Sequence, residues 1–167
     1  MRHQEEPAAL DRKLLAMGFD IAVGVPDSTL TGILGELGAS IPVHVTPRED
    51  TAVAVACGLA LAGARPVVYM KNAGLMTAGD ALLSLARDME VPLFLLVGWA
   101  GSGEDHLPHH VVTGERTTAF LEGLAISWRI HQPGMQAELA GWHQDCSRRH
   151  EHSALLIPPG GHHAHEN

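Results

Sequence analysis

The sequence predicts an open α/β fold, in which a single, mostly parallel six-stranded sheet carries helices on both faces. Short apolar runs alternate with helical segments along the chain, and the runs are apolar almost continuously rather than at every second residue. Strands of that kind are buried on both faces, as in parallel sheets between two helix layers. The 167 residues suffice for one domain with a substantial core. We expect residues 1–160 to form that domain, followed by a polar, disordered tail at 161–167.

Each apolar run is followed by a segment with helical periodicity or small, helix-compatible residues. The predicted strands are 20–26, 42–47, 65–71, 92–99, 127–130 and 153–159. The predicted helices are 5–17, 28–38, 49–63, 115–125 and 133–149, with a turn leading into a helix over 72–90. Ser28 or Thr29 is the predicted cap of the second helix. These patterns do not reveal the order of the strands in the sheet.

The composition excludes several classes of protein. A net charge of −8 argues against a nucleic-acid partner, because phosphate binding needs a basic face. The N-terminus has no signal-peptide pattern, and no apolar segment reaches the ~20 residues that span a bilayer. The two cysteines show no disulfide or metal-binding spacing. We therefore expect a soluble, cytoplasmic protein.

Groups that can do chemistry gather where four predicted strands end. These ends read "VPDS", "TPRED", "MKNAGL" and "GWAGSGED". In open α/β sheets, ligands bind at the carboxyl ends of the strands. The "MKNAGL" turn has neither the glycine pattern of a dinucleotide fold nor that of a phosphate loop. Three histidines in "EDHLPHH" lack the helical or Cys-X-X-Cys spacing typical of zinc sites, so we assign no metal site to them.

The helix predicted over 49–63 begins with Glu49 and Asp50 and continues almost entirely in small or aliphatic residues. The acidic pair would stabilise the positive end of the helix dipole. Alternatively, Glu49 is a carboxylate held in an apolar surround and used for proton transfer. One face of this helix would pack on the sheet of its own domain. The other face is apolar as well, which indicates a surface for a partner.

Five segments, taken in order, resemble the pyrimidine-binding domain of thiamine-diphosphate-dependent enzymes, in particular sulfopyruvate and phosphonopyruvate decarboxylases. They are "GVPDSTL", "TPREDTAVAVACGLALAGARPVVYMKNAGL", "PLFLLVGWAG", "PHHVVTGE" and "ALLIPPG", and the resemblance covers about residues 10–160. The resemblance implies thiamine diphosphate as the cofactor. It implies that Glu49 contacts the pyrimidine nitrogen N1′ and thereby promotes removal of the proton from thiazolium C2. His109 and His110 match the region where related decarboxylases place histidines over the reacting carbons.

The same resemblance implies roles for residues at the strand ends. The residues expected to bind the cofactor, in addition to Glu49, are Pro26, Asn72, Gly74 and Leu75. The residues expected to bind the substrate are Asp27, Ser28, Arg48 and Lys71. Lys71 stands where relatives commonly have glutamine, and its charge would hold a sulfonate or phosphonate. It is equally compatible with a solvated strand end.

The sequence lacks the GDG motif through which these enzymes bind the Mg²⁺ of the cofactor. The resemblance therefore implies a separate β subunit that carries the diphosphate and Mg²⁺ site, in an α2β2 or larger assembly with the active site between subunits. The implied reaction is decarboxylation of 3-sulfopyruvate or 3-phosphonopyruvate to the aldehyde and CO2. Two alternatives are a carboligase subunit, as in acetolactate synthases, and a non-catalytic regulatory or scaffolding domain.

Overall fold

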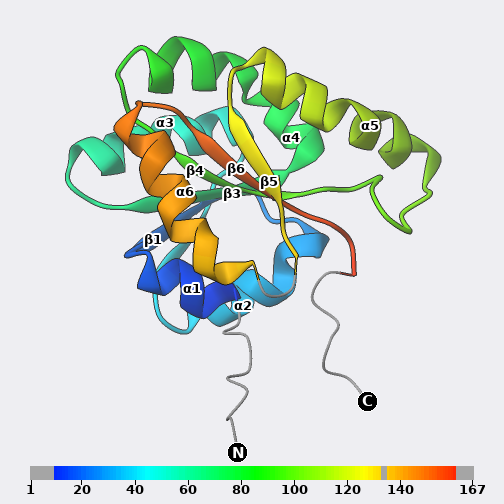
Figure 1. Ribbon diagram of the computed structural model, residues 1–167, viewed down its shortest axis with the longest axis horizontal. Coiled ribbons are helices and arrows are strands. Elements are labelled where there is room, and N and C mark those ends of the chain that lie inside the picture. The colour runs from blue at the N-terminus through cyan, green and yellow to red at the C-terminus, as the bar shows by residue number, and fades with distance from the viewer. Residues whose placement is uncertain (1–9, 133–134, 161–167) are drawn as a thin grey trace, which may run out of the picture.

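A computed structural model, which describes residues 10–132 and 135–160, contains one six-stranded sheet with the strand order β2-β1-β3-β4-β6-β5 (Figure 1). Every pair of neighbouring strands is parallel. The strands are β1 (Ile21–Gly24), β2 (Val43–Val45), β3 (Pro66–Lys71), β4 (Phe94–Gly98), β5 (Ser127–Ile130) and β6 (Ser153–Ile157). The predicted fold class is confirmed. The predicted tail at 161–167 and the first part of the helix predicted over 5–17 lie outside the described residues.

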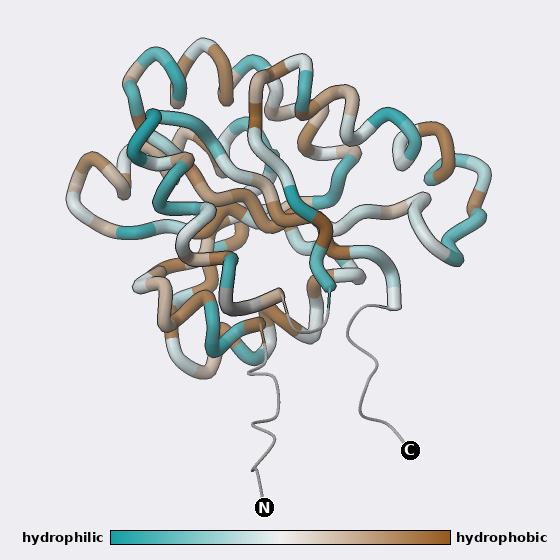
Figure 2. Tube along the Cα trace, viewed as in Figure 1, coloured by the Kyte–Doolittle hydropathy of each residue, from teal (hydrophilic) through white to brown (hydrophobic). Residues whose placement is uncertain are grey.

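Helices cover both faces of the sheet (Figure 1). They are α1 (Leu10–Ala16), η1 (Ser28–Leu30), α2 (Thr31–Gly38), α3 (Glu49–Leu61), α4 (Asn72–Thr77), η2 (Ala81–Arg87), α5 (Pro108–Gly123) and α6 (Gln136–Arg148). Buried residues of α1, α2 and α6 share one core cluster, and those of α3, α4, η2 and α5 share the other. The most apolar part of the chain accordingly lies in the central strands (Figure 2).

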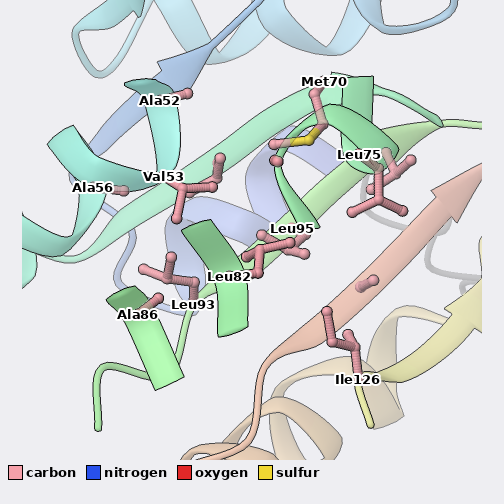
Figure 3. Close-up of a cluster of buried hydrophobic side chains, with 14 of the residues drawn as sticks. Ala52, Val53, Ala56, Met70, Leu75, Leu82, Ala86, Leu93, Leu95 and Ile126 are labelled. Carbon is pink, nitrogen blue, oxygen red and sulfur yellow. The ribbon is translucent and has the colours of Figure 1, made fainter. Parts of the chain in front are cut away.

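The two central strands explain why the apolar runs are continuous. Successive side chains of a strand point to opposite faces, and in β3 Val68 and Met70 join one core cluster while Val67 and Tyr69 join the other. The strand β4 alternates in the same way. The cluster beneath α3 and η2 is built from small and aliphatic residues, which lets both helices approach the sheet closely (Figure 3).

Two local expectations were wrong. The helix predicted over 115–125 begins earlier, at Pro108, because proline suits the first turn of a helix, where its missing N–H is not needed. His109 and His110 therefore lie in the first turn of α5 rather than in a loop. Neither Ser28 nor Thr29 caps the second helix: Asp27 caps η1, its carboxylate accepting the N–H of Thr29 at 3.1 Å, and α2 follows η1 without a side-chain cap.

The segment predicted as a turn leading into a helix over 72–90 contains two helices, so the expected turn at its start is helical. The α-helix α4 begins at Asn72, directly after β3, and the π-helical turn η2 follows from Ala81. Between them, Gly79 lies against the ring of Phe120 in α5, where a Cβ atom would come within 2.8 Å of the ring. Within the described residues, no helix has the length and apolar character needed to cross a lipid bilayer.

Two buried histidines join the helices to the sheet. The ring of His152 accepts the N–H of Leu93 at Nδ1, so its Nε2 carries the proton and donates to the carbonyl of Leu82. His143 packs against the rings of Phe19 and Phe94. Burial lowers the pKa of His152, and it lowers that of His143 from 6.5 to about 4. Both rings are therefore neutral in the folded protein at neutral pH.

This burial predicts acid sensitivity. The folded pKa of His143 lies below its unfolded value, so the unfolded chain binds more protons, and stability is lost as the pH falls from 6.5 toward 4. The contribution of this one ring is on the order of 3 kcal/mol of unfolding free energy. Replacing it by phenylalanine, together with Ser153→Ala so that its hydroxyl partner is not left unpaired, should flatten this dependence. Urea unfolding at several pH values measures it, and an unchanged pH slope would contradict the assignment.

Candidate active site

The strand order places three chemically rich segments side by side. Strands β1, β3 and β4 are neighbours in the parallel sheet, so the residues that follow them meet at one edge. Asp27 follows β1, Asn72 follows β3, and the loop from Trp99 follows β4. The expectation that "VPDS", "MKNAGL" and "GWAGSGED" share an edge is confirmed.

Glu49 is a half-buried carboxylate at this edge that has no partner among the described residues. It begins α3, is half-buried, and lies directly on the backbone of Gly74, where an added Cβ would come within 2.2 Å of its Oε1. Only a glycine admits the carboxyl group at this place. Within the described part of the chain, no hydrogen bond or ion pair engages the Glu49 carboxylate. The carboxyl group thus lies against the backbone of Gly74, and its oxygens remain available to a ligand.

Two other carboxylates near this edge, those of Asp27 and Asp50, are already engaged. Asp27 is buried, caps η1, and lies against Gly98, where a Cβ would come within 2.1 Å of its Oδ2. Asp50 accepts two hydrogen bonds from the exposed guanidinium of Arg48, at 3.1 Å from Nε to Oδ1 and 2.8 Å from Nη2 to Oδ2. The hydrogen bond lowers the pKa of Asp50 and raises that of Arg48. Arg48, which was expected to bind substrate, therefore forms an ion pair with Asp50 in this conformation.

Asn72 holds the turn after β3 in place. Its side chain is fully buried, and Nδ2 donates to the carbonyl of Ala100 at 2.9 Å and to the hydroxyl of Thr117 at 3.0 Å. These bonds connect the start of α4 to the loop after β4 and to α5. Its Oδ1 atom is buried and accepts no hydrogen bond from the described residues. The next buried residues along α4 are Gly74 and Leu75.

Lys71 and His110 meet at the same edge. Lys71 ends β3, and its Nζ atom lies 2.7 Å from Nε2 of His110. Nδ1 of His110 lies 2.7 Å from Oδ2 of Asp105, a residue of the loop between β4 and α5. His109 is exposed, and its ring centroid lies 4.3 Å from that of His110. Pro26 and Ser28, on the neighbouring turn, are also exposed.

Asp105, Thr117 and Gly98 also contact the residues at this edge, and no motif in the sequence pointed to Thr117 or Gly98. Asp105 stands five residues before His110, a spacing that brings side chains together only because the loop folds back onto the first turn of α5. Thr117 accepts a hydrogen bond from Asn72, and Gly98 leaves room for the carboxylate of Asp27. Both contacts depend on the strand order. The "EDHLPHH" segment contained the only usable signal, an acid beside histidines.

One surface next to the site is apolar and exposed. The residues of α3 that face away from the core are Ala54, Val55, Gly58 and Leu61. Val55 is 40% and Leu61 60% exposed, high values for aliphatic side chains at helical spacing on one face. The expected apolar second face of this helix is therefore present at the surface of the isolated chain.

Comparison with known proteins identifies a family whose model matches most of the chain. The family model described as "Thiamine pyrophosphate enzyme, N-terminal TPP binding domain" matches residues 8–126. The chain is 30% identical over 143 residues to sulfopyruvate decarboxylase subunit alpha of Methanothermobacter thermautotrophicus, which covers 84% of this chain and 87% of the relative. It is 27% identical over 113 residues to sulfopyruvate decarboxylase of Methanosarcina acetivorans, which covers 68% of this chain but only 29% of that longer relative.

A solved structure supports the same fold. The 2-oxoglutarate:ferredoxin oxidoreductase of Magnetococcus marinus superposes with a TM-score of 0.68 at 14% sequence identity. The superposition covers 90% of this chain and 28% of that protein. The chain thus corresponds to a part of these larger proteins and to most of the length of the separate alpha subunit from Methanothermobacter thermautotrophicus.

The contact between Glu49 and Gly74 can be tested by substitution. Gly74→Ala should lower the unfolding free energy by roughly 1–3 kcal/mol, because the new methyl group overlaps the carboxylate. The same change at Gly35, which faces open space in α2, should be neutral or slightly stabilising. Combining Gly74→Ala with Glu49→Ala should recover much of the loss in a chemical unfolding experiment. A Gly74→Ala protein as stable as the Gly35→Ala control would rule out the contact.

Proposed function

The chain belongs to the thiamine pyrophosphate enzymes, whose N-terminal TPP binding domain it contains, and on this basis we propose that it is the α subunit of a thiamine-diphosphate-dependent decarboxylase. Its substrate is 3-sulfopyruvate, and the products are the aldehyde and CO2. The names of the relatives support the sulfonate rather than the phosphonate as the substrate. Both cysteines are free and buried, which suits a cytoplasmic enzyme.

The availability of Glu49 carries this proposal. A carboxyl group that exchanges a proton with a ring nitrogen must be held in place without being neutralised by a neighbouring cation. Glu49 meets both conditions, since it lies on Gly74 and has no ion-pair partner among the described residues. Asp50, its neighbour in the sequence, fails the second condition, because the guanidinium of Arg48 binds it. The position of Glu49 thus fits a residue that holds the aminopyrimidine ring of the cofactor.

Thiamine diphosphate, when bound, supplies the nucleophilic carbon that adds to the 2-oxo acid and accepts the electrons released as CO2 leaves. The chain contributes the pyrimidine side of the site. Glu49 holds a proton at the ring nitrogen, and the glycine at position 74 keeps the space beside it open. Leu75 is buried in the same turn, Asn72 fixes that turn, and Pro26 borders the edge.

The substrate lies at the same edge. Lys71 provides an ammonium group for the sulfonate, and Asp27, Ser28 and Arg48 surround the adjoining turn. For Arg48 to bind the substrate, it would have to exchange Asp50 for the anion. His109 and His110, in the first turn of α5, complete the polar side of the site.

A second subunit completes the site. The β subunit carries the GDG motif and the ligands of Mg²⁺, and it packs on the exposed face of α3, where Ala54 and Gly58 allow close approach. The assembly is α2β2 or larger. Support comes from the "subunit alpha" in the relative's name and from the apolar character of this face.

Glu49→Gln tests the function directly. This substitution keeps the size of the side chain but removes the exchangeable proton, so it should lower kcat for CO2 release from 3-sulfopyruvate by about 10²- to 10⁴-fold. The assay uses the chain co-purified with the β subunit, identified as a neighbouring reading frame that encodes the GDG motif. Asp50→Asn is the matched control and should retain kcat. Full activity of Glu49→Gln would refute the assigned role.

The partner surface makes a separate prediction. Val55→Arg introduces a charge on the exposed face of α3 and should abolish co-purification with the β subunit, since a buried unpaired charge is costly. Gly35→Arg, on the exposed side of α2 across the sheet, should leave the complex intact. Analytical ultracentrifugation distinguishes the two. If both variants assemble equally well with the β subunit, the interface lies on another surface of the chain.

A further inference from the structure

Three charged or ionisable side chains form a continuous hydrogen-bonded series at the edge of the site. They come from three different elements: Lys71 from the end of β3, His110 from the first turn of α5, and Asp105 from the loop that joins β4 to α5. Both contacts are short, 2.7 Å from Lys71 Nζ to His110 Nε2 and 2.7 Å from His110 Nδ1 to Asp105 Oδ2. The side chains of His110 and Asp105 are only 18% and 14% exposed.

The chemistry of the outer two groups determines the state of the central ring. An ammonium group has only hydrogens to offer, so Nε2 of His110 accepts from Lys71 and carries no proton. The proton of the neutral ring is then on Nδ1, which donates it to Asp105. In this arrangement His110 presents no N–H to the substrate edge. The hydrogens that face the substrate belong to Lys71, which uses one of its three on the histidine.

Asp105 is itself held firmly. Its Oδ2 accepts the N–H of Gly101 at 2.9 Å, and its Oδ1 accepts the N–H of Leu107 at 3.3 Å. The hydrogen bond from Gly101, together with those from His110 and Leu107, lowers the pKa of Asp105, so the group is a carboxylate. The carboxylate can therefore serve as a fixed acceptor for the histidine.

The loop between β4 and α5 is held against α5 by contacts other than the Asp105–His110–Lys71 series. Ser102 Oγ donates to the carbonyl of Trp99 at 2.6 Å, and the indole of Trp99 donates to the carbonyl of Gly114 at 3.0 Å. The backbone of Gly101 packs directly on that of Gly114, with no room for a side chain between them. These contacts already seat the loop on α5. The Asp105–His110–Lys71 series adds a link to β3, at the point where the substrate is proposed to bind.

We propose that Asp105 is a positioning residue for substrate specificity: by fixing His110 as the tautomer with its proton on Nδ1, it holds the Lys71 ammonium in place for the sulfonate of the substrate. The recognition of the sulfonate rests on the proposed function, whereas the tautomer and the placement of Lys71 do not. Of the two alternatives for Lys71, the structure disfavours a solvated strand end, because the Nζ atom of Lys71 is bound by His110.

Histidine NMR on the full chain tests the tautomer without any activity measurement. With ¹⁵N-labelled histidine, and His110 assigned through His110→Gln, two-bond ¹H–¹⁵N correlations report which ring nitrogen carries the proton. We expect the Nδ1-protonated form in the wild type and in Asp105→Asn, whose amide oxygen can still accept. Asp105→Ala removes the acceptor that orients the ring against Lys71, so the ring can turn away from the ammonium and should lose this preference, whereas Ser102→Ala, in the same loop, should keep it. A wild-type ring protonated on Nε2 or on both nitrogens, or an unchanged ring in Asp105→Ala, overturns the proposal.

Kinetics with the β subunit test the link to the substrate. Asp105→Ala and Lys71→Met should each raise KM for 3-sulfopyruvate about tenfold or more with a smaller effect on kcat, and the double variant should be no worse than Lys71→Met alone. Ser102→Ala should keep the wild-type KM. Additive effects, or an unchanged KM in Asp105→Ala, would overturn the positioning role. If the wild-type complex does not turn over 3-sulfopyruvate, the proposed function fails, while the NMR result still decides the placement.

Discussion

The seating of the Glu49 carboxylate on the backbone of Gly74 is the contact on which the site depends. It requires a glycine in the first turns of α4 and a helix that begins with its acidic residue at the sheet edge. Since Arg48 binds Asp50 instead, Glu49 keeps its oxygens for a ligand while its position is fixed by packing. A carboxyl group used for proton exchange needs that combination, and neither packing nor charge alone would provide it.

The strand order then decides what surrounds this carboxyl group. Because β1, β3 and β4 are adjacent, the capping Asp27, the buried Asn72 and the loop carrying Asp105 converge on one edge. The same edge of the isolated chain lies beside the exposed apolar face of α3. Under the proposed function, the domain would be one wall of a composite site, with the acid–base and specificity groups on this wall and the diphosphate and Mg²⁺ groups on the partner.

The sequence predicted the fold class and the chemically rich strand ends that meet at one edge, because continuous apolar strands and their polar ends are local patterns. It did not predict the strand order, which is set by packing between distant segments. It placed His109 and His110 in a loop, since the start of α5 at Pro108 carries no polar cap that would mark it. Asp105 and Gly98 were missed for a related reason. Their roles arise from contacts with His110 and Asp27 that exist only once the loop and the neighbouring strands have come together.

The most direct measurement of the central claim is an experimental structure of this chain in complex with its β subunit and thiamine diphosphate. The account predicts that a carboxylate oxygen of Glu49 lies within hydrogen-bonding distance of pyrimidine N1′, with Gly74 still against the same carboxyl group and α3 facing the partner subunit. A cofactor whose pyrimidine ring is bound elsewhere, with Glu49 exposed to solvent and α3 uncovered, would contradict it.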